Sequence, residues 1–360
     1  MAGENGSSKL RIAVLFGGRS SEHEVSVMSA TNVVRALDPA RYDVVPIFVG
    51  RSGRWFESRF ADGVLARPSS GTELAPVPGG AGRTVAISAD GTLAEGPRFD
   101  LLFPVLHGLD GEDGSVQGLA AVAGVPLVGC GILGSATALD KDVAKRLLTE
   151  AGLPTARSIT LRPGAVPAFA EVAEQLGRPL FVKPARQGSS VGVAKVADAD
   201  GWEAAVAAGF RFDDKLVVEE FVAGREIECA VLEDLGGALF VSRPGEIVPA
   251  ASHGFYTYEA KYVDADGAAL MVPADLPPEV EATVRDIAAE AFRAVGCDGM
   301  ARVDVFVTAD RRILVNELNT IPGFTDISMY PKAMAASGVA TGDLLDRLIA
   351  HALGRAATTP

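Results

Sequence analysis

The stretch Ala301-Arg-Val-Asp-Val-Phe-Val-Thr-Ala-Asp-Arg-Arg-Ile-Leu-Val-Asn-Glu-Leu-Asn-Thr-Ile-Pro-Gly323 contains two apolar runs separated by a short polar segment. This pattern predicts two strands joined by a tight turn. Charged and amide side chains interrupt both runs where a purely structural hairpin would carry Val or Leu. They are Arg302, Asp304, Glu317 and Asn319. The interruptions indicate that the hairpin carries a site.

The spacing of these four residues predicts how they lie. Residues two apart on a strand share a face, so Arg302 pairs with Asp304, and Glu317 with Asn319. A turn near Asp310 sets Asp304 opposite Glu317. Two carboxylates about 4 Å apart repel by roughly 4 kcal/mol at an effective dielectric of 20, so this arrangement favours a bound cation. Oxygen ligands of this kind suit Mg²⁺, which predicts a metal site at Asp304, Glu317 and Asn319.

The bulk composition narrows the class of protein. A chain of 360 residues with 48% hydrophobic and 22% charged residues is typical of a globular protein of two or three domains. The net charge of -13 argues against a nucleic-acid-binding surface, which would be basic. We therefore expect small-molecule partners and no nucleic acid.

The cysteines and the N-terminal residues predict the cellular compartment of the protein. The three cysteines, Cys130, Cys229 and Cys297, are far apart in sequence and lie in apolar surroundings. They predict buried thiols in a reducing compartment rather than disulfides. Residues 1–9 lack the apolar core of a signal peptide, and no run approaches the roughly 18 apolar residues of a membrane span. We expect a cytoplasmic protein without a membrane partner.

The chain opens with an α/β pattern and two glycine-rich loops. Residues 10–16 form an apolar run, residues 17–24 a glycine turn, and a helical pattern follows through residue 37. Glu22 in this turn fits either a ligand contact or a first-turn acid that stabilises the helix. The loop from His107 to Gly114 follows the predicted strand 101–106, at the strand end where α/β sheets bind ligands. His107 fits either substrate binding or a structural hydrogen bond. Between these loops, residues 51–96 predict short β segments without added chemistry.

Lysines and a Ser/Gly turn mark the middle of the chain. Lys141 lies in a predicted helix, 135–151, where a lysine is most often solvated. A predicted strand delivers Lys183, and the turn Gly188-Ser189-Ser190 leads to a further strand. Such a hairpin tip can fold over phosphates, with Lys183 as a point charge, although a flexible tip beside an unrelated lysine is the alternative.

Two later segments predict a base pocket and a lid. The strand that ends in Glu219-Glu220-Phe221-Val222 runs into a connection of the kind in which adenine pockets occur. Residues 244–262 form a long loop that includes Tyr256, Tyr258 and Tyr262. A loop of this length is usually a lid or binding element, and a packed aromatic corner is the alternative.

Taken together, these segments resemble the ATP-grasp superfamily and, within it, the D-alanine–D-alanine ligase family over nearly the whole chain. The stretches that carry the resemblance are Phe16-Gly-Gly-Arg-Ser-Ser-Glu-His-Glu-Val-Ser26, His107-Gly-Leu-Asp-Gly-Glu-Asp-Gly114, Phe181-Val-Lys-Pro-Ala-Arg-Gln-Gly-Ser-Ser-Val-Gly192, Phe255-Tyr-Thr-Tyr-Glu-Ala-Lys-Tyr262 and Asn316-Glu-Leu-Asn-Thr-Ile-Pro-Gly323.

The resemblance implies an α/β fold, α+β in its C-terminal part, with three domains. Residues 1–131 are expected to form a Rossmann-like, pre-ATP-grasp substrate domain. Residues 132–219 are expected to form the central ATP-grasp subdomain with the phosphate flap, and residues 220–360 the C-terminal subdomain with the metal site and lid. The family is typically dimeric, which implies a homodimer.

The resemblance also implies the reaction and the residue roles. One D-alanine attacks the γ-phosphate of ATP to give an acyl phosphate, and the amine of a second D-alanine displaces phosphate to give D-alanyl-D-alanine for peptidoglycan precursors. Two Mg²⁺ ions are expected, with Mn²⁺ as a substitute. The implied catalytic residues are Glu22, Ser189, Tyr262, Arg302 and Gly323. The implied substrate-binding residues are His107, Lys261, Ser328 and Met329. The implied ATP-binding residues are Lys141, Lys183, Ser190, Glu219, Val222 and Glu226.

Two alternatives to this reading of the function are open. A D-alanine–D-lactate ligase shares the fold, but Tyr262 resembles the amine-specific members rather than the resistance-type depsipeptide ligases. A nucleotide-binding regulator on an inactive scaffold would have lost a metal ligand or a phosphate lysine. The residues concerned are all present, which disfavours this alternative: Asp304, Glu317, Asn319, Lys141 and Lys183.

Overall fold

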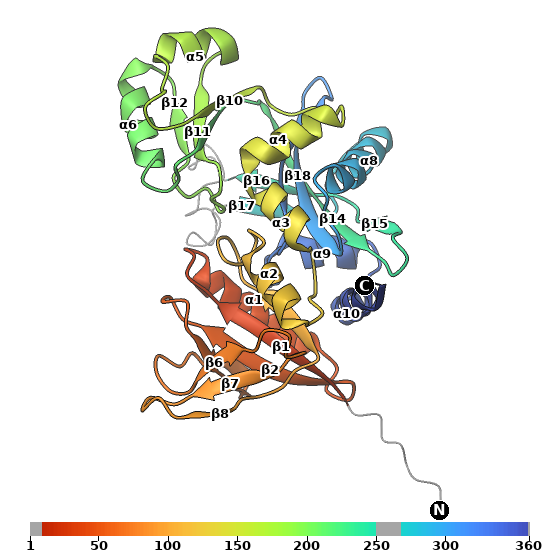
Figure 1. Cartoon of the computed structure of the whole chain (residues 1–360). Coiled ribbons are helices and arrows are strands. Elements are labelled where there is room, and N and C mark those ends of the chain that lie inside the picture. The colour runs from red at the N-terminus through yellow and green to blue at the C-terminus, as the bar shows by residue number, and fades with distance from the viewer. Residues whose placement is uncertain (1–8, 250–267, 359–360) are drawn as a thin grey trace, which may run out of the picture.

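The computed structural model describes residues 9–249 and 268–358. Most of the expected lid, including Lys261 and Tyr262, therefore lies outside the described residues. The described chain forms an N-terminal lobe, a central lobe and a C-terminal lobe, with the C-terminal lobe between the other two (Figure 1). No helix in the described part of the chain is both long and apolar enough to cross a membrane.

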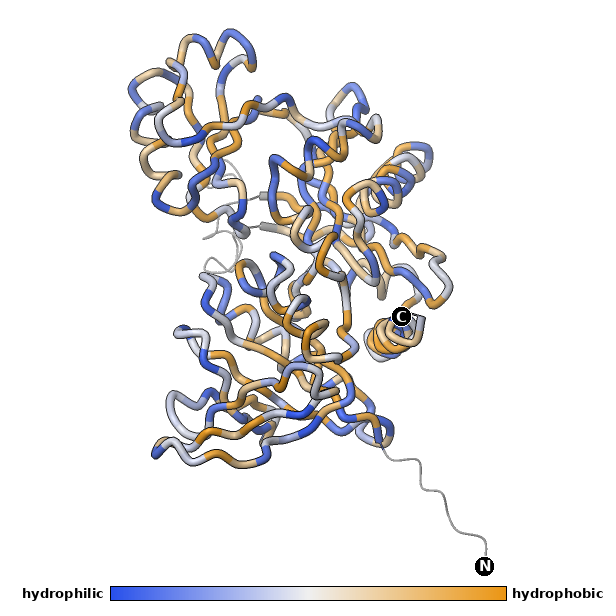
Figure 2. The backbone as a smooth tube through the Cα atoms, viewed as in Figure 1, coloured by the Kyte–Doolittle hydropathy of each residue, from blue (hydrophilic) through white to orange (hydrophobic). Residues whose placement is uncertain are grey.

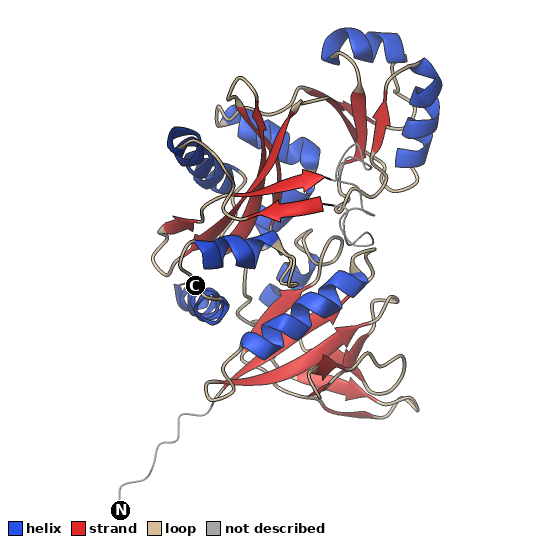
Figure 3. Cartoon of the chain, turned by 180° about the vertical axis from the view of Figure 1, so that it is seen from behind, coloured by secondary structure: helices blue, strands red, loops and turns tan. Residues whose placement is uncertain are grey.

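The N-terminal lobe is an α/β sheet with helices on both faces. Its central strand β1 (Leu10–Gly17) pairs in parallel with β2 (Tyr42–Val49) and β9 (Leu101–Val105). Ile12, Val14 and Phe16 pack on the side of α1 (His23–Ala36), and Ala13 and Leu15 on the side of α2 (Ser115–Ala123). Burial on both faces explains why β1 is apolar throughout rather than alternating. Figure 3 shows α1 lying along one face of this sheet.

The segment 51–96 extends this sheet, as expected from its short β patterns. The sheet order is β8-β7-β6-β3-β2-β1-β9, and the added strands pair antiparallel. Their bounds are β3 (Trp55–Glu57), β6 (Glu73–Pro76), β7 (Thr84–Ile87) and β8 (Leu93–Glu95), with β4 (Phe60–Ala61) and β5 (Val64–Leu65) forming a separate small hairpin.

The central lobe is an antiparallel sheet in the order β10-β13-β11-β12, covered by two helices. The bounds are β10 (Ser158–Leu161), α5 (Phe169–Leu176), β11 (Leu180–Pro184), β12 (Ala194–Val196), α6 (Ala199–Gly209) and β13 (Leu216–Glu220). Strands β11 and β12 are the two arms of the predicted phosphate flap, and its tip contains Ser189 and Ser190.

The C-terminal lobe contains a larger antiparallel sheet in the order β17-β16-β14-β18-β19, with β15 against β14. The bounds are β14 (Gly224–Glu233), β15 (Leu239–Val241), β16 (Gly245–Pro249), β17 (Ala268–Met271), α8 (Pro278–Ala294), β18 (Met300–Thr308), β19 (Ile313–Asn319), α9 (Met329–Ala336) and α10 (Thr341–Thr358). Alternate residues of β14 pack toward α8 or toward α9 and α10, so this sheet is also covered on both faces. Figure 2 shows apolar and polar residues alternating along α8, as expected for a helix that packs on the sheet with one side only.

The helix predicted at 135–151 is two helices, α3 (Ile132–Leu139) and α4 (Lys141–Glu150), separated at Asp140. Asp140 has extended backbone angles, and its side chain accepts a hydrogen bond from the backbone N–H of Val143 as an N-cap. Both helices lie beside the C-terminal sheet, and Ala138, Ala144 and Leu148 belong to its core (Figure 1). Helices α3 and α4 therefore pack with the C-terminal lobe. Within residues 132–219, the central lobe begins only after α4. The order of residues along the chain alone did not reveal which sheet these helices cover.

Candidate active site

Two adjoining cavities lie where the lobes meet. The larger has a volume of about 400 Å³ and lies between the central and C-terminal sheets. The smaller has a volume of about 90 Å³ and lies between the N-terminal lobe and the C-terminal sheet. Four residues line both cavities and form the boundary between them: Gly188, Glu228, Ile247 and Glu317.

The residues predicted from the sequence divide between these cavities. The larger cavity is lined by Lys141, Lys183, Ser190, Glu219, Val222, Glu226, Asp304 and Glu317. The smaller cavity is lined by Glu22, His107, Ser189, Arg302, Glu317, Asn319, Gly323, Ser328 and Met329. Every predicted site residue within the described ranges therefore faces one cavity or the other, whereas Lys261 and Tyr262 lie outside those ranges.

Glu219 is held at the end of β13 by two lysines. Its carboxylate lies 2.5 Å from Lys183 Nζ and 2.9 Å from Lys145 Nζ. Burial favours the neutral acid, but the two lysines prevail and lower the pKa of Glu219 to about 2. Lys183 is likewise desolvated, and Glu219 raises its pKa above the usual value. Both groups are therefore ionised at neutral pH, and Lys145 is a partner that the sequence motifs did not reveal.

Lys141 projects from the N-terminus of α4 toward the flap. Its Nζ donates to the carbonyl oxygen of Gln187 at 2.7 Å and lies 3.5 Å from a carboxylate oxygen of Glu317. The alternative of an ordinary solvated lysine is excluded by this placement, because only 11% of the side chain is exposed. The lysine instead reaches the wall shared by the two cavities.

The hairpin of β18 and β19 has the predicted register at the site, and the pairing shifts by one residue between Asp304 and Val305. Asp304 pairs with Glu317 across the strands, and Arg302 with Asn319. Arg302 donates to the two carboxylate oxygens of Asp304 at 2.7 and 2.6 Å, and its Nε lies 3.1 Å from Glu228. Burial opposes the charge on Arg302, but these carboxylates raise its pKa well above the usual value. Arg302 is thus a fixed cation beside the smaller cavity.

The predicted metal ligands lie together on this hairpin. Asp304 is buried, and Asn319 Nδ2 donates to one of its oxygens at 3.1 Å. Asp304 and Glu317 line the larger cavity, and Glu317 and Asn319 line the smaller one. Two carboxylates and one amide on adjacent strands are a donor set that fits Mg²⁺.

The tip of the flap is joined to the N-terminal lobe. Ser189 Oγ donates to Glu22 Oε1, and both Ser189 and Ser190 have positive φ, at 49° and 58°. A Cβ on Gly188 would lie 3.1 Å from Glu22 Oε2, so glycine at this position permits the close approach. Glu22 makes no side-chain capping bond to α1. Its contacts therefore favour a role in the site over a role in helix stability.

His107 also makes structural contacts while it lines the smaller cavity. Its Nδ1 lies 2.9 Å from the carbonyl oxygen of Ile321, and its Nε2 lies 3.3 Å from Ser29 Oγ. Burial lowers the pKa of His107, although Glu22 opposes this shift. The structural reading of His107 is therefore confirmed by its contacts with Ile321 and Ser29, and its substrate-binding role stays a prediction.

Glu112 is a buried member of the smaller cavity that the sequence analysis did not select. Its carboxylate accepts hydrogen bonds from Gly108 N at 2.7 Å and Ile321 N at 3.0 Å. Burial and the nearby charge of Glu22 raise the pKa of Glu112 to about 7. The sequence could have predicted this residue, because Glu112 belongs to the acidic glycine-rich loop that follows β9.

The loop after β19 ends the smaller cavity at Gly323. A Cβ at this position would lie 2.6 Å from Ser328 Oγ, so any other residue requires Ser328 to rotate or the loop to shift. Ser328 Oγ accepts a hydrogen bond from Thr325 N at 2.9 Å, and Met329 begins α9 beside it. The loop places a backbone N–H and a hydroxyl at the same end of the cavity.

Comparison with known families agrees with this geometry. Residues 11–130 match the family described as "D-ala D-ala ligase N-terminus", and residues 147–350 match "D-ala D-ala ligase C-terminus". The chain belongs to the D-alanine–D-alanine ligase family. Its fold is accordingly the ATP-grasp fold expected from the sequence.

Individual members of the D-alanine–D-alanine ligase family match along nearly their whole length. "D-alanine--D-alanine ligase A" of Brucella suis is 63% identical over 349 residues, covering 97% of this chain and 99% of the relative. The solved D-alanine-D-alanine ligase of Coxiella burnetii is 38% identical, with a TM-score of 0.83 over 97% of this chain and 95% of that one. The Bacillus anthracis D-alanine–D-alanine ligase, solved in complex with ATP, is 27% identical, with a TM-score of 0.72 over 97% and 99%.

Proposed function

We propose that this member of the D-alanine–D-alanine ligase family joins two D-alanines at the expense of ATP, through a D-alanyl phosphate, and supplies the dipeptide of peptidoglycan precursors. The observation that supports it most strongly is the pair of cavities with a shared wall at Gly188, Glu228, Ile247 and Glu317. A γ-phosphate in the larger cavity and a carboxylate in the smaller one would meet at this wall, and such transfer depends mainly on positioning and charge neutralisation.

The larger cavity is assigned to ATP. Lys141, Lys183 and the flap residue Ser190 supply cations and a donor for the phosphates. The base is assigned to the end of β13, with Glu219 and Val222 beside it. Aromatic rings line this end of the cavity, and those of Phe181 and Phe221 stand 6.1 Å apart. Glu226 on β14 is assigned to the ribose.

Asp304, Glu317 and Asn319 are assigned to Mg²⁺, with two ions expected and Mn²⁺ as a substitute. When bound, the metal would neutralise charge on the phosphates. Arg302 orients Asp304 through its two hydrogen bonds. Lys141 beside Glu317 contributes a fixed positive charge at the shared wall.

The smaller cavity is assigned to the amino acids. Glu22 would bind the ammonium of the first D-alanine, and Ser189 continues a hydrogen-bonded chain that is expected to reach Tyr262. Arg302 and Gly323 both line this cavity, and Arg302 and the N–H of Gly323 would stabilise the oxyanion of the tetrahedral intermediate. Ser328 and Met329 would meet the carboxylate of the second D-alanine, with His107 in the wall and Lys261 nearby.

The proposed activity is tested by incubating the pure protein with ATP, Mg²⁺ and D-alanine. We expect equal amounts of ADP, phosphate and D-alanyl-D-alanine, and hydrolysis of ATP without dipeptide would contradict the proposal. Adding D-lactate as a competitor across a pH series tests the depsipeptide alternative, and we expect the dipeptide to predominate at neutral pH. The expected cytoplasmic location remains a prediction, to be checked by cell fractionation.

We further propose that the protein is a homodimer. The support is the exposure of large apolar side chains on two contacting helices of the described chain, with Val122 on α2 63% exposed and Leu133 on α3 67% exposed. We infer that these side chains are covered in a protein interface, which is a common role of exposed apolar surface. Light scattering after size exclusion should give a dimer mass, and the double change Val122→Glu/Leu133→Glu should give monomers. Leu93→Glu, on the distant strand β8, is the matched control.

A further inference from the structure

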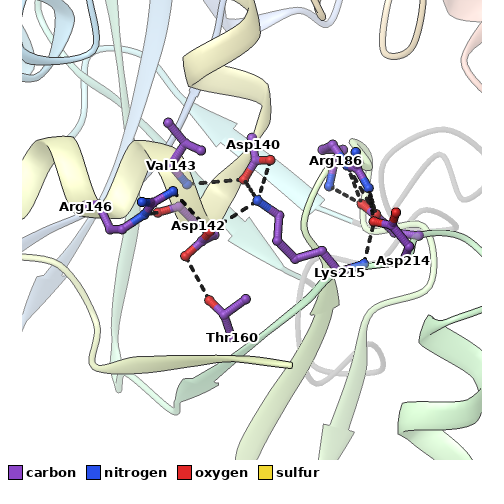
Figure 4. A network of polar contacts seen from close by, with 9 residues as sticks. Asp140, Asp142, Val143, Arg146, Thr160, Arg186, Asp214 and Lys215 are labelled. Atoms are coloured by element: carbon purple, nitrogen blue, oxygen red, sulfur yellow. Dashed lines mark hydrogen bonds and ion pairs between the residues drawn. The ribbon is translucent and has the colours of Figure 1, made fainter. Parts of the chain in front are cut away.

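Lys215 is a buried lysine that lines neither cavity. It directly precedes β13, and only 7% of its side chain is exposed. Its Nζ lies 2.6 Å from Asp140 and 3.2 Å from Asp142, as Figure 4 shows. An ammonium is costly to bury unless it is paired and hydrogen-bonded, so these carboxylates are needed to retain it there.

The two carboxylates flank Lys141 in the sequence. Asp140 also caps α4 by accepting from Val143 N at 3.2 Å, and Asp142 accepts from Thr160 Oγ1 at 2.9 Å. Lys215 therefore binds the first turn of α4 on both sides of the lysine assigned to the phosphates.

A chain of backbone hydrogen bonds closes the same connection. The N–H of Lys141 donates to the carbonyl of Ala185 at 3.0 Å, and the N–H of Ala185 donates to the carbonyl of Lys215 at 2.9 Å. The side-chain and backbone links together form a ring through Asp140, Lys141, Ala185 and Lys215. Such a ring fixes the direction in which Lys141 leaves the helix.

This ring joins two lobes. Ala144 and Leu148 of α4 belong to the core of the C-terminal sheet, whereas Leu216 and Val218, which follow Lys215, belong to the core of the central sheet. The larger cavity lies between these sheets. The distance between its two walls therefore depends in part on the ion pairs of Lys215.

The network also reaches the base of the flap. Asp213 accepts from Arg186 N at 2.7 Å and from Lys215 N at 3.1 Å, and Arg186 pairs with Asp214 (Figure 4). The next residue, Gln187, accepts the hydrogen bond from Lys141 Nζ. Lys215, Lys141 and the start of the flap thus belong to one connected set of contacts.

We propose that Lys215 is a positioning residue for the nucleotide: its ion pairs with Asp140 and Asp142 hold Lys141 against the flap and set the separation of the two lobes that enclose the phosphates. The proposal rests on the function proposed above, because that function assigns the larger cavity to ATP. Loss of the ion pairs would weaken ATP binding and leave the amino-acid cavity largely unaffected.

The test compares Lys215→Met with the double variant Lys215→Met/Asp142→Asn. The single change removes the ammonium that pairs with two partly buried carboxylates and lowers stability. The second change removes one of these charges and keeps an acceptor for Thr160. The matched control is Arg347→Met, which breaks an ion pair with Asp234 on another face at 2.6 Å. Thermal unfolding, the Kd of Mg-ATP by calorimetry and the separate KM values for ATP and D-alanine are measured.

We expect both Lys215 variants to raise the KM and Kd for ATP about tenfold, with the KM for D-alanine within about twofold of wild type. The double variant should regain stability without regaining ATP affinity. The proposal is overturned if ATP affinity returns with stability, or if Arg347→Met raises the KM for ATP equally. A wild-type protein that makes no dipeptide would instead contradict the proposed function, so the two failures are distinguishable.

Discussion

The hydroxyl of Ser189 donates a hydrogen bond to the carboxylate of Glu22, which joins the tip of the flap to the first helix turn of the N-terminal lobe. The neighbouring Gly188 lines both cavities, so the flap covers the place where the two substrates would meet. One contact between residues far apart in the chain thus links closure over the nucleotide to the group proposed to bind the first amino acid.

Replacing Ser189 by Ala should weaken this link and lower kcat/KM for D-alanine. A hydrogen bond to a charged group contributes about 1.5–3 kcal/mol, which corresponds to a loss of roughly 10- to 100-fold. Steady-state kinetics at saturating ATP measure the effect. Ser69→Ala, at an exposed position, is the control and should change nothing. A kcat/KM for Ser189→Ala equal to that of wild type would contradict the proposed role of the hydrogen bond between Ser189 and Glu22.

The change Gly323→Ala should reduce kcat without unfolding the protein. The new methyl group would lie 2.6 Å from Ser328 Oγ, which a hydrogen bond from Thr325 N holds in place. We therefore expect the loop to shift and to move the N–H proposed to stabilise the oxyanion. Loss of one such donor typically costs about 100- to 1,000-fold in kcat. Gly118→Ala, on α2 with open space around it, is the control for a glycine change that is tolerated. A kcat close to wild type in Gly323→Ala would exclude the assigned role of this loop.

The change Glu317→Ala tests the metal assignment. We expect turnover to fall about 1,000-fold, because charge neutralisation by a metal contributes several kcal/mol, while the thermal unfolding temperature stays near that of wild type. The affinity for Mn²⁺ in the presence of ATP, followed by electron paramagnetic resonance, should fall in parallel. Retained activity and retained Mn²⁺ binding would refute the ligand role of Glu317.

Glu112 should make the stability of the protein depend on pH. Its pKa rises from 4.5 to about 7 in the folded state, because of burial and the nearby Glu22. Between these values the folded state holds a proton that the unfolded state has lost, so the free energy of unfolding falls as pH increases. The stabilisation from this group is complete below about pH 4.5 and is lost as pH rises through about 7.

Comparison with Glu112→Gln isolates this contribution. The variant cannot titrate at this position, so the difference in unfolding free energy between wild type and variant should decrease as pH rises from 5 to 8. Chemical denaturation at several pH values measures it. A difference that is independent of pH would show that Glu112 is already ionised in the folded protein throughout this range.

The sequence predicted the local features of the site well. Asp304 and Glu317 lie opposite each other as the strand periodicity required, and the Ser/Gly turn is the tip of a flap between β11 and β12. Both predictions depend on contacts within a hairpin, for which spacing along the chain determines the geometry.

Contacts between lobes could not be predicted from the sequence. Glu112 and Ile321 are joined by a hydrogen bond across 209 residues, and nothing in either motif specifies the other as its partner. The separation of α3 from α4 at Asp140, and the packing of both helices on the C-terminal sheet, depend likewise on tertiary contacts. The ion pairs of Lys215 could not be predicted from the sequence for the same reason, because its two carboxylate partners come from another lobe.

The central claim is that a carboxylate in the smaller cavity attacks a phosphate in the larger one across their shared wall. Its most direct test is the fate of oxygen from D-alanine labelled with ¹⁸O in its carboxylate, followed by mass spectrometry of the released phosphate. Formation of an acyl phosphate, and its displacement by the second amine, transfers one labelled oxygen to each phosphate. We predict this transfer in step with dipeptide formation. Unlabelled phosphate released together with D-alanyl-D-alanine would contradict the account.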